Sequence, residues 1–175
     1  ETELDEKVQR ILKAKESVPS ATPSNIQEGK DLKQLLFEKA ATLVKNEDVL
    51  PLSFMENTLF FTLHVAKPFL PPLDGFEALD KVVFFLKGFN YALPNYGMDE
   101  QIFPFLQEAK KKCKTCLVLM GTPYALAFLQ ADAILVLYEE VEKELAIDIL
   151  YGKKKPSGKL PVTAGKFPAG HGESF

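Results

Sequence analysis

The sequence has 175 residues, of which 46% are hydrophobic, and its formal net charge at pH 7 is −3. This length suits one sizeable core with appendages, and the charge balance gives no basic field or stripe that would attract nucleic acid or anionic lipid. The longest apolar runs, residues 117–120 and 133–138, are too short to span a membrane.

The chain begins with a segment that predicts an amphipathic helix over residues 4–16, because apolar residues recur at helical spacing at Leu4, Val8, Ile11 and Leu12. The opening letters ETELDEKVQR contain no apolar segment typical of a signal peptide, so we expect none there. Residues 18–30 are rich in Ser, Pro and Thr, which is typical of a linker. We therefore expect residues 1–17 to be a piece of another domain.

A second helix is predicted to begin at Asp31, as its cap, and to end near Lys45, with Val44 facing a core. Four apolar and aromatic stretches then predict strands, namely NTLFFTLHV, KVVFFLKGF, TCLVLMG and DAILVLYE. Because these apolar runs are unbroken, we expect the strands to be buried on both faces.

Helical segments follow the predicted strands in turn, namely GFEALDKV, MDEQIFPFLQEAKKK, YALAFLQ and EVEKELAIDILYG. Pro104 lies early in the longest of them and predicts a late start or a kink. The alternation predicts an α/β fold over residues 31–163, followed by a tail over residues 164–175. We expect a three-layer α/β/α sandwich with a mostly parallel sheet of about five or six strands.

The segment YGKKKPSGKLPVT looks at first like a phosphate loop, but its spacing is wrong for one. Five residues separate Gly152 from Gly158, and Lys159 is followed by Leu160 instead of Ser or Thr. Pro156 also lacks the N–H group that an anion cradle needs. We instead predict a turn in which Gly158 takes a positive φ, followed by an extended segment.

No metal site or cofactor is predicted. Cys113 and Cys116 form a C-x-x-C, but His64 and His171 lie at no spacing that would complete a zinc site. Redox pairs of this kind open a helix, whereas this pair follows a helix and leads into a strand, which favours inert structural thiols. We interpret His64 as a hydrogen-bonded structural residue and His171 as solvated. A flavodoxin-like cofactor binder is disfavoured, because no glycine-rich loop follows the first predicted strand.

Four stretches in order resemble glycoside hydrolase family 3, namely LDEKVQRILKAKE, AATLVKNEDVLPL, MGTPYALAF…ADAILVLYE and GKKKPSGKLPVT. The set is similar to the carboxyl-terminal part of the family's N-acetylhexosaminidase branch. The first stretch resembles the last helix of the catalytic (β/α)8 barrel, and the remainder resembles the α/β/α sandwich that follows it. The resemblance is weakest over residues 68–89.

The resemblance implies that the catalytic groups lie outside this chain. In this family the nucleophilic aspartate belongs to the barrel, so we expect no catalytic residue here. Many β-glucosidase members take an acid/base glutamate from a sandwich loop, but KGFNYALPNYGMDEQ lacks that motif. Asp99 and Glu100 are interpreted as acids in the first turn of a helix. The departure fits the hexosaminidase branch, whose acid/base is a histidine and aspartate pair on a barrel loop.

The resemblance therefore implies a retaining β-N-acetylglucosaminidase as the parent, with the barrel of the same chain as partner and carbohydrate as its substrate. A β-glucosidase-type parent remains an alternative, as does a stand-alone binding or scaffold domain without an active site. The family's usual work on wall-derived or dietary glycans is compatible with a periplasmic or secreted parent, although no residue shows export.

Loops at the carboxyl ends of parallel strands are where ligands bind in such sheets. The residues predicted to line a cleft rim or to press on the barrel are Asn90, Tyr91, Tyr96, Gly121, Thr122, Pro123 and Tyr124. Tyrosines suit both tasks, because they stack on sugar rings and fill interfaces. The GTPYAL segment can equally be only a tight turn between a strand and a helix.

Overall fold

The computed structural model describes residues 2–16, 26–141 and 143–175, and it divides the chain into two units, residues 1–34 and 35–175. The first unit contains helix α1 (Thr2–Glu16), in agreement with the predicted helix, and its apolar side chains at Val8, Ile11 and Leu12 are exposed. Helix α2 (Ile26–Ala40) begins before the expected start at Asp31. The remaining part of the expected linker, residues 18–25, lies outside the described residues.

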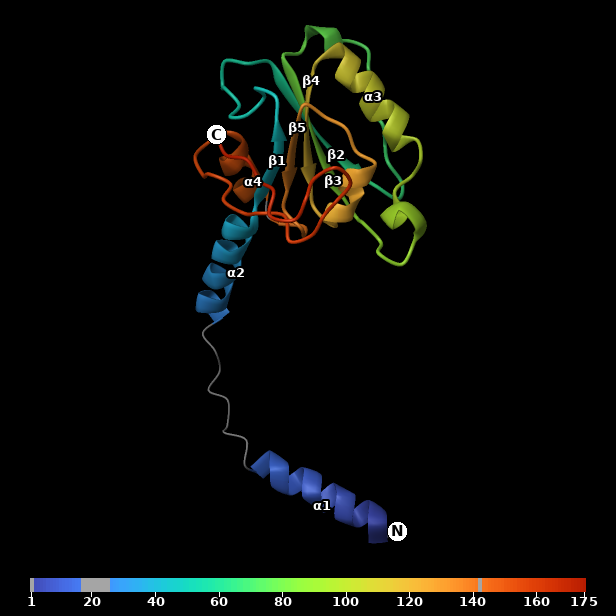
Figure 1. The fold of residues 1–175 in the computed structure, drawn as a ribbon, viewed down its shortest axis with the longest axis vertical. Helices are drawn as coiled ribbons and strands as arrows, with labels where there is room; N and C mark the ends of the chain where they lie inside the picture. Colours follow the sequence, from blue (N-terminus) through green and yellow to red (C-terminus); the bar gives the residue numbers. More distant parts are fainter. Residues whose placement is uncertain (1, 17–25, 142) are drawn as a thin grey trace. The chain divides into compact units, whose positions relative to one another are not determined.

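The second unit is built on a five-stranded sheet with the strand order β1-β5-β4-β3-β2 (Figure 1). Strands β2, β3, β4 and β5 run parallel to one another, whereas β1 runs antiparallel to β5. The mostly parallel α/β sandwich predicted from the sequence is therefore confirmed. The strands are β1 (Thr42–Asn46), β2 (Thr58–His64), β3 (Lys81–Lys87), β4 (Lys114–Leu119) and β5 (Ala133–Val136).

The helical elements of this unit are helix α3 (Ile102–Lys112), helix α4 (Lys143–Leu150) and the short 3-10 turns η1 (Phe76–Ala78), η2 (Pro94–Gly97) and η3 (Pro123–Ala127). Helix α3 starts late, as Pro104 predicted, which places the proline in the first turn, where its missing N–H has no helical acceptor. Asp99 and Glu100 consequently lie before the helix. The Asp99 carboxylate accepts a hydrogen bond from the Gln101 N–H at 2.9 Å.

Two hydrophobic cores lie on opposite faces of the sheet, because alternate residues of a strand point to opposite faces. In β3, Val82, Phe84 and Leu86 belong to the core that includes residues of α3, η1 and η3. Val83 and Phe85 belong to the other core, which includes residues of α4. The buried β3 and β4 match the unbroken apolar runs in their sequences.

Two strand expectations were wrong. Residues 42–46 form β1 instead of continuing the preceding helix, so Val44 enters the core from an edge strand. Strand β2 lies at the other edge of the sheet and is partly exposed, with Leu59 and Phe60 at 44% and 37% exposure. An edge strand has one neighbour, so its apolar side chains are covered on one side only.

The expected turn at Pro-Ser-Gly was also wrong. The chain turns earlier, at Gly152, where φ is 72° and the N–H donates to the Ile149 carbonyl at the end of α4. Gly158 is required for a different reason, because its backbone lies directly against β1. A Cβ at this position would lie 2.0 Å from the Ala40 carbonyl oxygen and 2.6 Å from the Thr42 hydroxyl.

The C-terminal tail packs against β1 and forms part of the second unit. The Glu173 N–H donates to the Leu43 carbonyl at 2.7 Å, and the two residues form an isolated antiparallel bridge. His171 was expected to be solvated, but its Nε2 lies 2.7 Å from the Val44 carbonyl oxygen and its ring stacks on Phe167. The tail is thus held by backbone and side-chain bonds to the edge of the sheet.

Candidate functional site

Three tyrosines lie at the carboxyl edge of the parallel strands, in the loops that follow β3 and β4; Tyr91 and Tyr124 are exposed, and Tyr96 is half-buried against the core. Tyr96 in η2 and Tyr124 in η3 stack with ring centroids 6.3 Å apart and an interplanar angle of 19°. Tyr124 is 46% exposed, and Tyr91, in the same loop as Tyr96, is 66% exposed. The fold thus pairs two aromatic rings from separate loops at one surface, which is the type of platform on which sugar rings stack.

The loop after β3 is held by its own backbone. The Asn90 N–H donates to the Tyr96 carbonyl at 2.8 Å, and the Asn90 side-chain oxygen accepts from the Ala92 N–H at 3.0 Å. Asn95 and Tyr96 adopt left-handed backbone conformations with φ of 49° and 58°. Such conformations are unfavourable for residues with a Cβ and are held by the surrounding structure, so the backbone that carries the Tyr96 ring is held in a defined conformation.

The loop after β4 uses Gly121 and Thr122 to make its turn. A Cβ on Gly121 would lie 2.3 Å from the Phe89 ring, so only glycine allows this approach. Thr122 is buried, and its hydroxyl accepts a hydrogen bond from the Tyr124 N–H at 3.3 Å. These contacts show that Gly121 and Thr122 have structural roles, and Asn90 likewise stabilises the loop after β3 through its hydrogen bonds. A sugar-facing role therefore stays a prediction for the whole set and concerns chiefly the three tyrosines.

Glu140 also lies at this edge of the sheet, which the sequence did not predict. Its carboxylate accepts a hydrogen bond from the Gly88 N–H at 3.1 Å and lies 3.6 Å from the Lys87 Nζ. Gly88 also packs against the His64 ring, where an added Cβ would lie 2.3 Å from Nε2. The ends of β2 and β3 are thereby linked to the segment after β5. No motif marks Glu140, since its partner lies 52 residues away.

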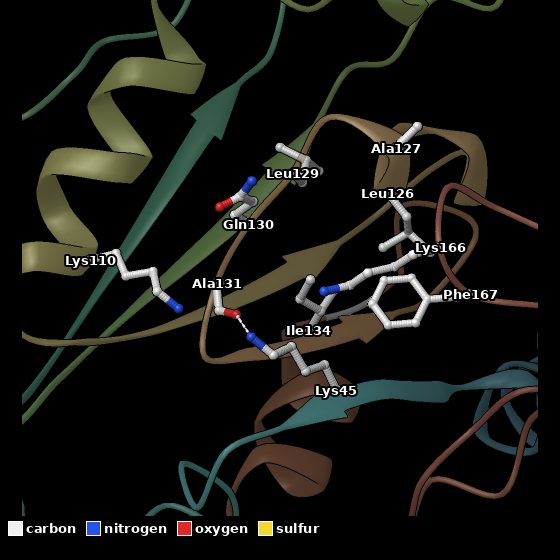
Figure 2. A pocket seen from close by; sticks show the side chains of 10 residues that line it. All are labelled: Lys45, Lys110, Leu126, Ala127, Leu129, Gln130, Ala131, Ile134, Lys166 and Phe167. Atoms are coloured by element: carbon white, nitrogen blue, oxygen red, sulfur yellow. Dashed lines mark hydrogen bonds between the residues drawn. The ribbon is translucent and has the colours of Figure 1, made fainter.

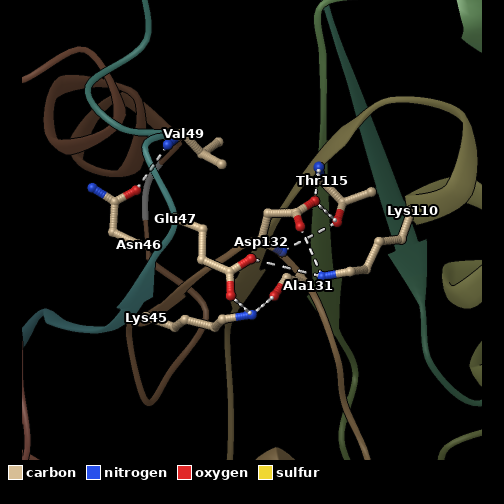
Figure 3. A network of polar contacts seen from close by, with 8 residues as sticks. All are labelled: Lys45, Asn46, Glu47, Val49, Lys110, Thr115, Ala131 and Asp132. Carbon is tan, nitrogen blue, oxygen red and sulfur yellow. Dashed lines mark hydrogen bonds and ion pairs between the residues drawn. The ribbon is translucent and has the colours of Figure 1, made fainter.

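A polar network lies at the opposite, amino-terminal edge of β4 and β5 (Figure 3). The Asp132 carboxylate accepts hydrogen bonds from the Thr115 N–H at 2.9 Å and from the Lys110 ammonium at 2.7 Å. Burial alone would raise the pKa of Asp132, but the hydrogen bonds from Lys110 and Thr115 and the Lys110 charge outweigh it, so the pKa lies below its ordinary value. This arrangement ties α3 to the sheet and is structural.

The same network extends to β1 through Glu47. Its carboxylate lies 2.9 Å from the Lys45 Nζ and 3.9 Å from the Lys110 Nζ. The Lys45 ammonium also donates to the Ala131 carbonyl at 2.6 Å. Glu47 therefore shares its charge between two lysines (Figure 3).

A pocket of about 250 Å³ opens beside this network, between the amino end of β5 and η3 (Figure 2). It was not predicted, because its lining comes from four separate stretches of the chain, one of which includes the end of η3, the turn that also carries Tyr124. The lining residues are Lys45, Lys110, Leu126, Ala127, Leu129, Gln130, Ala131, Ile134, Lys166 and Phe167.

The two cysteines are free thiols on either side of the start of β4. Cys116 is buried, which raises its pKa to about 12, and burial likewise raises the pKa of the half-buried Cys113. Neither thiol is activated at neutral pH. Within the described parts of the chain, no group of three metal-ligating side chains occurs. No helix among those same residues has the length and apolar character to cross a membrane.

No family model matches the sequence, and no curated protein matches it. Solved structures do match by fold. A fungal multi-domain GH3 β-N-acetylglucosaminidase, which has a GCN5-related glucosamine N-acetyltransferase region, is 17% identical at a TM-score of 0.63, over 85% of this chain and 20% of that one. A glycoside hydrolase family 3 β-N-acetylglucosaminidase from Paenibacillus sp. str. FPU-7 is 14% identical at 0.62, over 95% and 40%.

A β-glucosidase from Listeria innocua, solved with glucose, is 16% identical at a TM-score of 0.61, over 87% of this chain and 34% of that chain. The present chain thus spans between 20% and 40% of the length of these three proteins. The chain has the fold of a domain that such glycosidases contain.

Proposed function

We propose that the chain is the carboxyl-terminal α/β/α domain of a glycoside hydrolase family 3 enzyme that cleaves terminal β-linked N-acetylglucosamine. The observation that carries the proposal is the fold match over 95% of this chain to 40% of a family 3 β-N-acetylglucosaminidase. The ordered motifs of the sequence, including GKKKPSGKLPVT, support the same family. The β-glucosidase from Listeria innocua has a similar fold, so the fold match does not by itself identify the sugar.

In this proposal the domain positions and completes a site whose reacting groups belong to the barrel. Most retaining glycosidases use two carboxyl groups about 5–5.5 Å apart, and the hexosaminidase branch that this chain resembles takes its acid/base from a histidine and aspartate pair on the barrel. The loops that carry the tyrosines instead offer stacked rings, and Glu140, an acid at the same edge of the sheet, is already bound to the Gly88 N–H and lies beside Lys87. We therefore assign Tyr91, Tyr96 and Tyr124 to the cleft rim or to the barrel interface.

The test compares this 175-residue chain with the longer protein that includes the residues encoded upstream. Both are assayed with p-nitrophenyl β-N-acetylglucosaminide and with p-nitrophenyl β-glucoside. We expect the longer protein to hydrolyse the first substrate in preference to the second and the shorter chain to hydrolyse neither. Turnover by the shorter chain would overturn the proposed role, and preference for the glucoside would replace the sugar assignment with the β-glucosidase alternative.

A further inference from the structure

Three lysine ammonium groups converge on the pocket beside the polar network. Lys110 comes from α3, Lys45 from β1 and Lys166 from the C-terminal tail, and Figure 2 shows their side chains pointing toward the same space near Ala131 and Ile134. Three cations directed at one space repel each other, so an arrangement of this kind requires compensating negative charge.

The protein's own carboxylates compensate two of the three lysines. Lys110 is paired with Asp132 at 2.7 Å, and Lys45 with Glu47 at 2.9 Å. For Lys166, the contact found among the described residues is with the Phe167 ring, whose centroid lies 5.3 Å from Nζ. With three positive and two negative groups, the pocket carries one uncompensated positive charge, located on Lys166.

The position of Lys166 is set by the local backbone. Ala164 and Phe167 exchange two hydrogen bonds, of 2.9 and 3.1 Å, around the turn that carries Lys166. Gly165 has φ of 57° and approaches η3 closely, since an added Cβ would lie 2.8 Å from the Ala127 Cα. The backbone that carries Lys166 is therefore already ordered, so binding a ligand here requires no ordering of the backbone.

The walls of the pocket determine the size and chemistry of the uncharged part of the ligand. Leu126, Ile134 and Phe167 provide apolar surface, while the Gln130 amide can hydrogen-bond to hydroxyl groups. The volume of about 250 Å³ is below the range of drug-sized sites and fits a single small ring.

We propose that this pocket binds a small organic anion the size of a monosaccharide, with its anionic group at Lys166 and its hydroxylated part against Gln130 and the apolar wall. The anionic group is a carboxylate, as in a sugar acid, or a phosphate, as in a sugar phosphate. The inference does not depend on the proposed glycosidase function, because it rests on the three lysines and uses none of the tyrosines assigned to the cleft rim.

The experiment measures binding to the 175-residue chain by titration calorimetry at low ionic strength. The probes are D-glucuronate and D-glucose 6-phosphate as anions, D-glucose as the neutral analogue, and inorganic phosphate as an anion that lacks a sugar ring. We expect at least one sugar anion to bind at least about tenfold more tightly than both glucose and inorganic phosphate, the equivalent of about 1.4 kcal/mol. Which anion binds identifies the anionic group.

Three variants locate the site. Lys166→Met keeps the aliphatic stem on Phe167 but removes the charge, and we expect it to weaken binding of the anion about tenfold. Lys166→Arg should retain most of the affinity, and Lys111→Met, at the next position of α3 and paired with Glu108, should leave it unchanged. Because Lys166 is exposed, unchanged circular dichroism should accompany these variants.

Equal binding of glucose and the sugar anions would overturn the proposal, as would binding of inorganic phosphate as tight as theirs. An affinity that Lys166→Met leaves unaltered would place the anion elsewhere. Absence of binding by both sugar anions would also overturn it.

Discussion

The imidazole of His171 donates a hydrogen bond from Nε2 to the carbonyl oxygen of Val44, across a separation of 127 residues and a distance of 2.7 Å. The donor is assigned to the ring, because a carbonyl oxygen can only accept. This bond connects the C-terminal tail to the first strand of the sheet. Together with the bridge between Leu43 and Glu173, it makes the tail part of the folded unit.

The substitution His171→Ala should detach the tail without unfolding the sheet. It removes one hydrogen bond and the ring stacked on Phe167, so we expect a loss of about 1–2 kcal/mol in the free energy of unfolding. Amide exchange at Glu173 should accelerate in the variant, as measured by NMR or mass spectrometry. His64→Ala, at an exposed residue on the opposite edge strand β2, serves as the control; equal exchange in both variants would contradict the assigned role.

Gly158→Ala should destabilise the domain strongly. The added methyl group would meet the Ala40 carbonyl at 2.0 Å, and backbone cannot move aside as a flexible side chain can. We expect a cost of about 3 kcal/mol or more in urea unfolding. Gly29→Ala in α2 is the matched control, because the new Cβ meets nothing within 4 Å and alanine is the better helix former by about 1 kcal/mol. Similar stability of both variants would refute the close-packing explanation.

Sequence patterns predicted some strands of the sheet and missed another. Strands β3, β4 and β5 were predictable, because they are buried on both faces and their apolar runs are unbroken. Strand β1 was missed, since Leu43 and Val44 also continue the helical spacing of α2. Its identity depends on pairing with β5, about 90 residues later, and such pairing leaves no local signal.

The candidate site was predictable to a similar degree. The rule that ligands meet the carboxyl ends of parallel strands located the loops that bring Tyr96 and Tyr124 together. The role of Gly158 was misassigned, because a close approach to β1 and a positive φ both demand glycine and look alike in a sequence. The lysine pocket was not predicted, since Lys45 and Lys166 are distant in the chain and each looks like an ordinary surface lysine.

Stability should fall in acid partly through Asp132. Its pKa in the folded state lies below the ordinary 3.8, so the unfolded chain binds the proton more readily and the stabilising effect is lost as the pH falls through that range. Asp132→Asn should cost about 1.5–3 kcal/mol at pH 7 and less at about pH 3, as measured by urea unfolding. Asp148→Asn, in a surface pair with Lys153, should cost at most about 1 kcal/mol. An equal cost of Asp132→Asn at both pH values would contradict the pKa assignment.

The two thiols should differ in their reaction with iodoacetamide. Cys116 is buried with a pKa of about 12, so native protein at pH 8 should be alkylated at this residue only through unfolding. Cys113 is partly exposed and should react slowly, because its pKa is also raised. Peptide mass spectrometry distinguishes the two sites, and protein unfolded in urea gives the reference rates. Rapid native labelling of Cys116 would show that β4 is not buried as described.

The tyrosine edge makes a prediction for the longer glycosidase. If Tyr124 contributes to the cleft rim, Tyr124→Ala should lower kcat/KM for the N-acetylglucosaminide about 3- to 10-fold, the equivalent of one aromatic stacking contact. Tyr151→Ala, whose ring stacks on Phe54, is the control and should leave kcat/KM unchanged. If the kinetics and the domain stability of the Tyr124 variant are both unchanged, Tyr124 has no role at the cleft rim, and GTPYAL is only a turn between a strand and a helix.

The position of β1 affects how this domain is made on the ribosome. The first strand to emerge has β5 as its partner in the sheet and Glu173 as a further bridge, and both are translated much later. Until then the apolar side chains of Leu43 and Val44 stay open to solvent or to chaperones. Closure of the nascent domain must therefore wait for almost its whole sequence to leave the exit tunnel, and a stalled or truncated product would present an unpaired strand edge ready to associate with other chains.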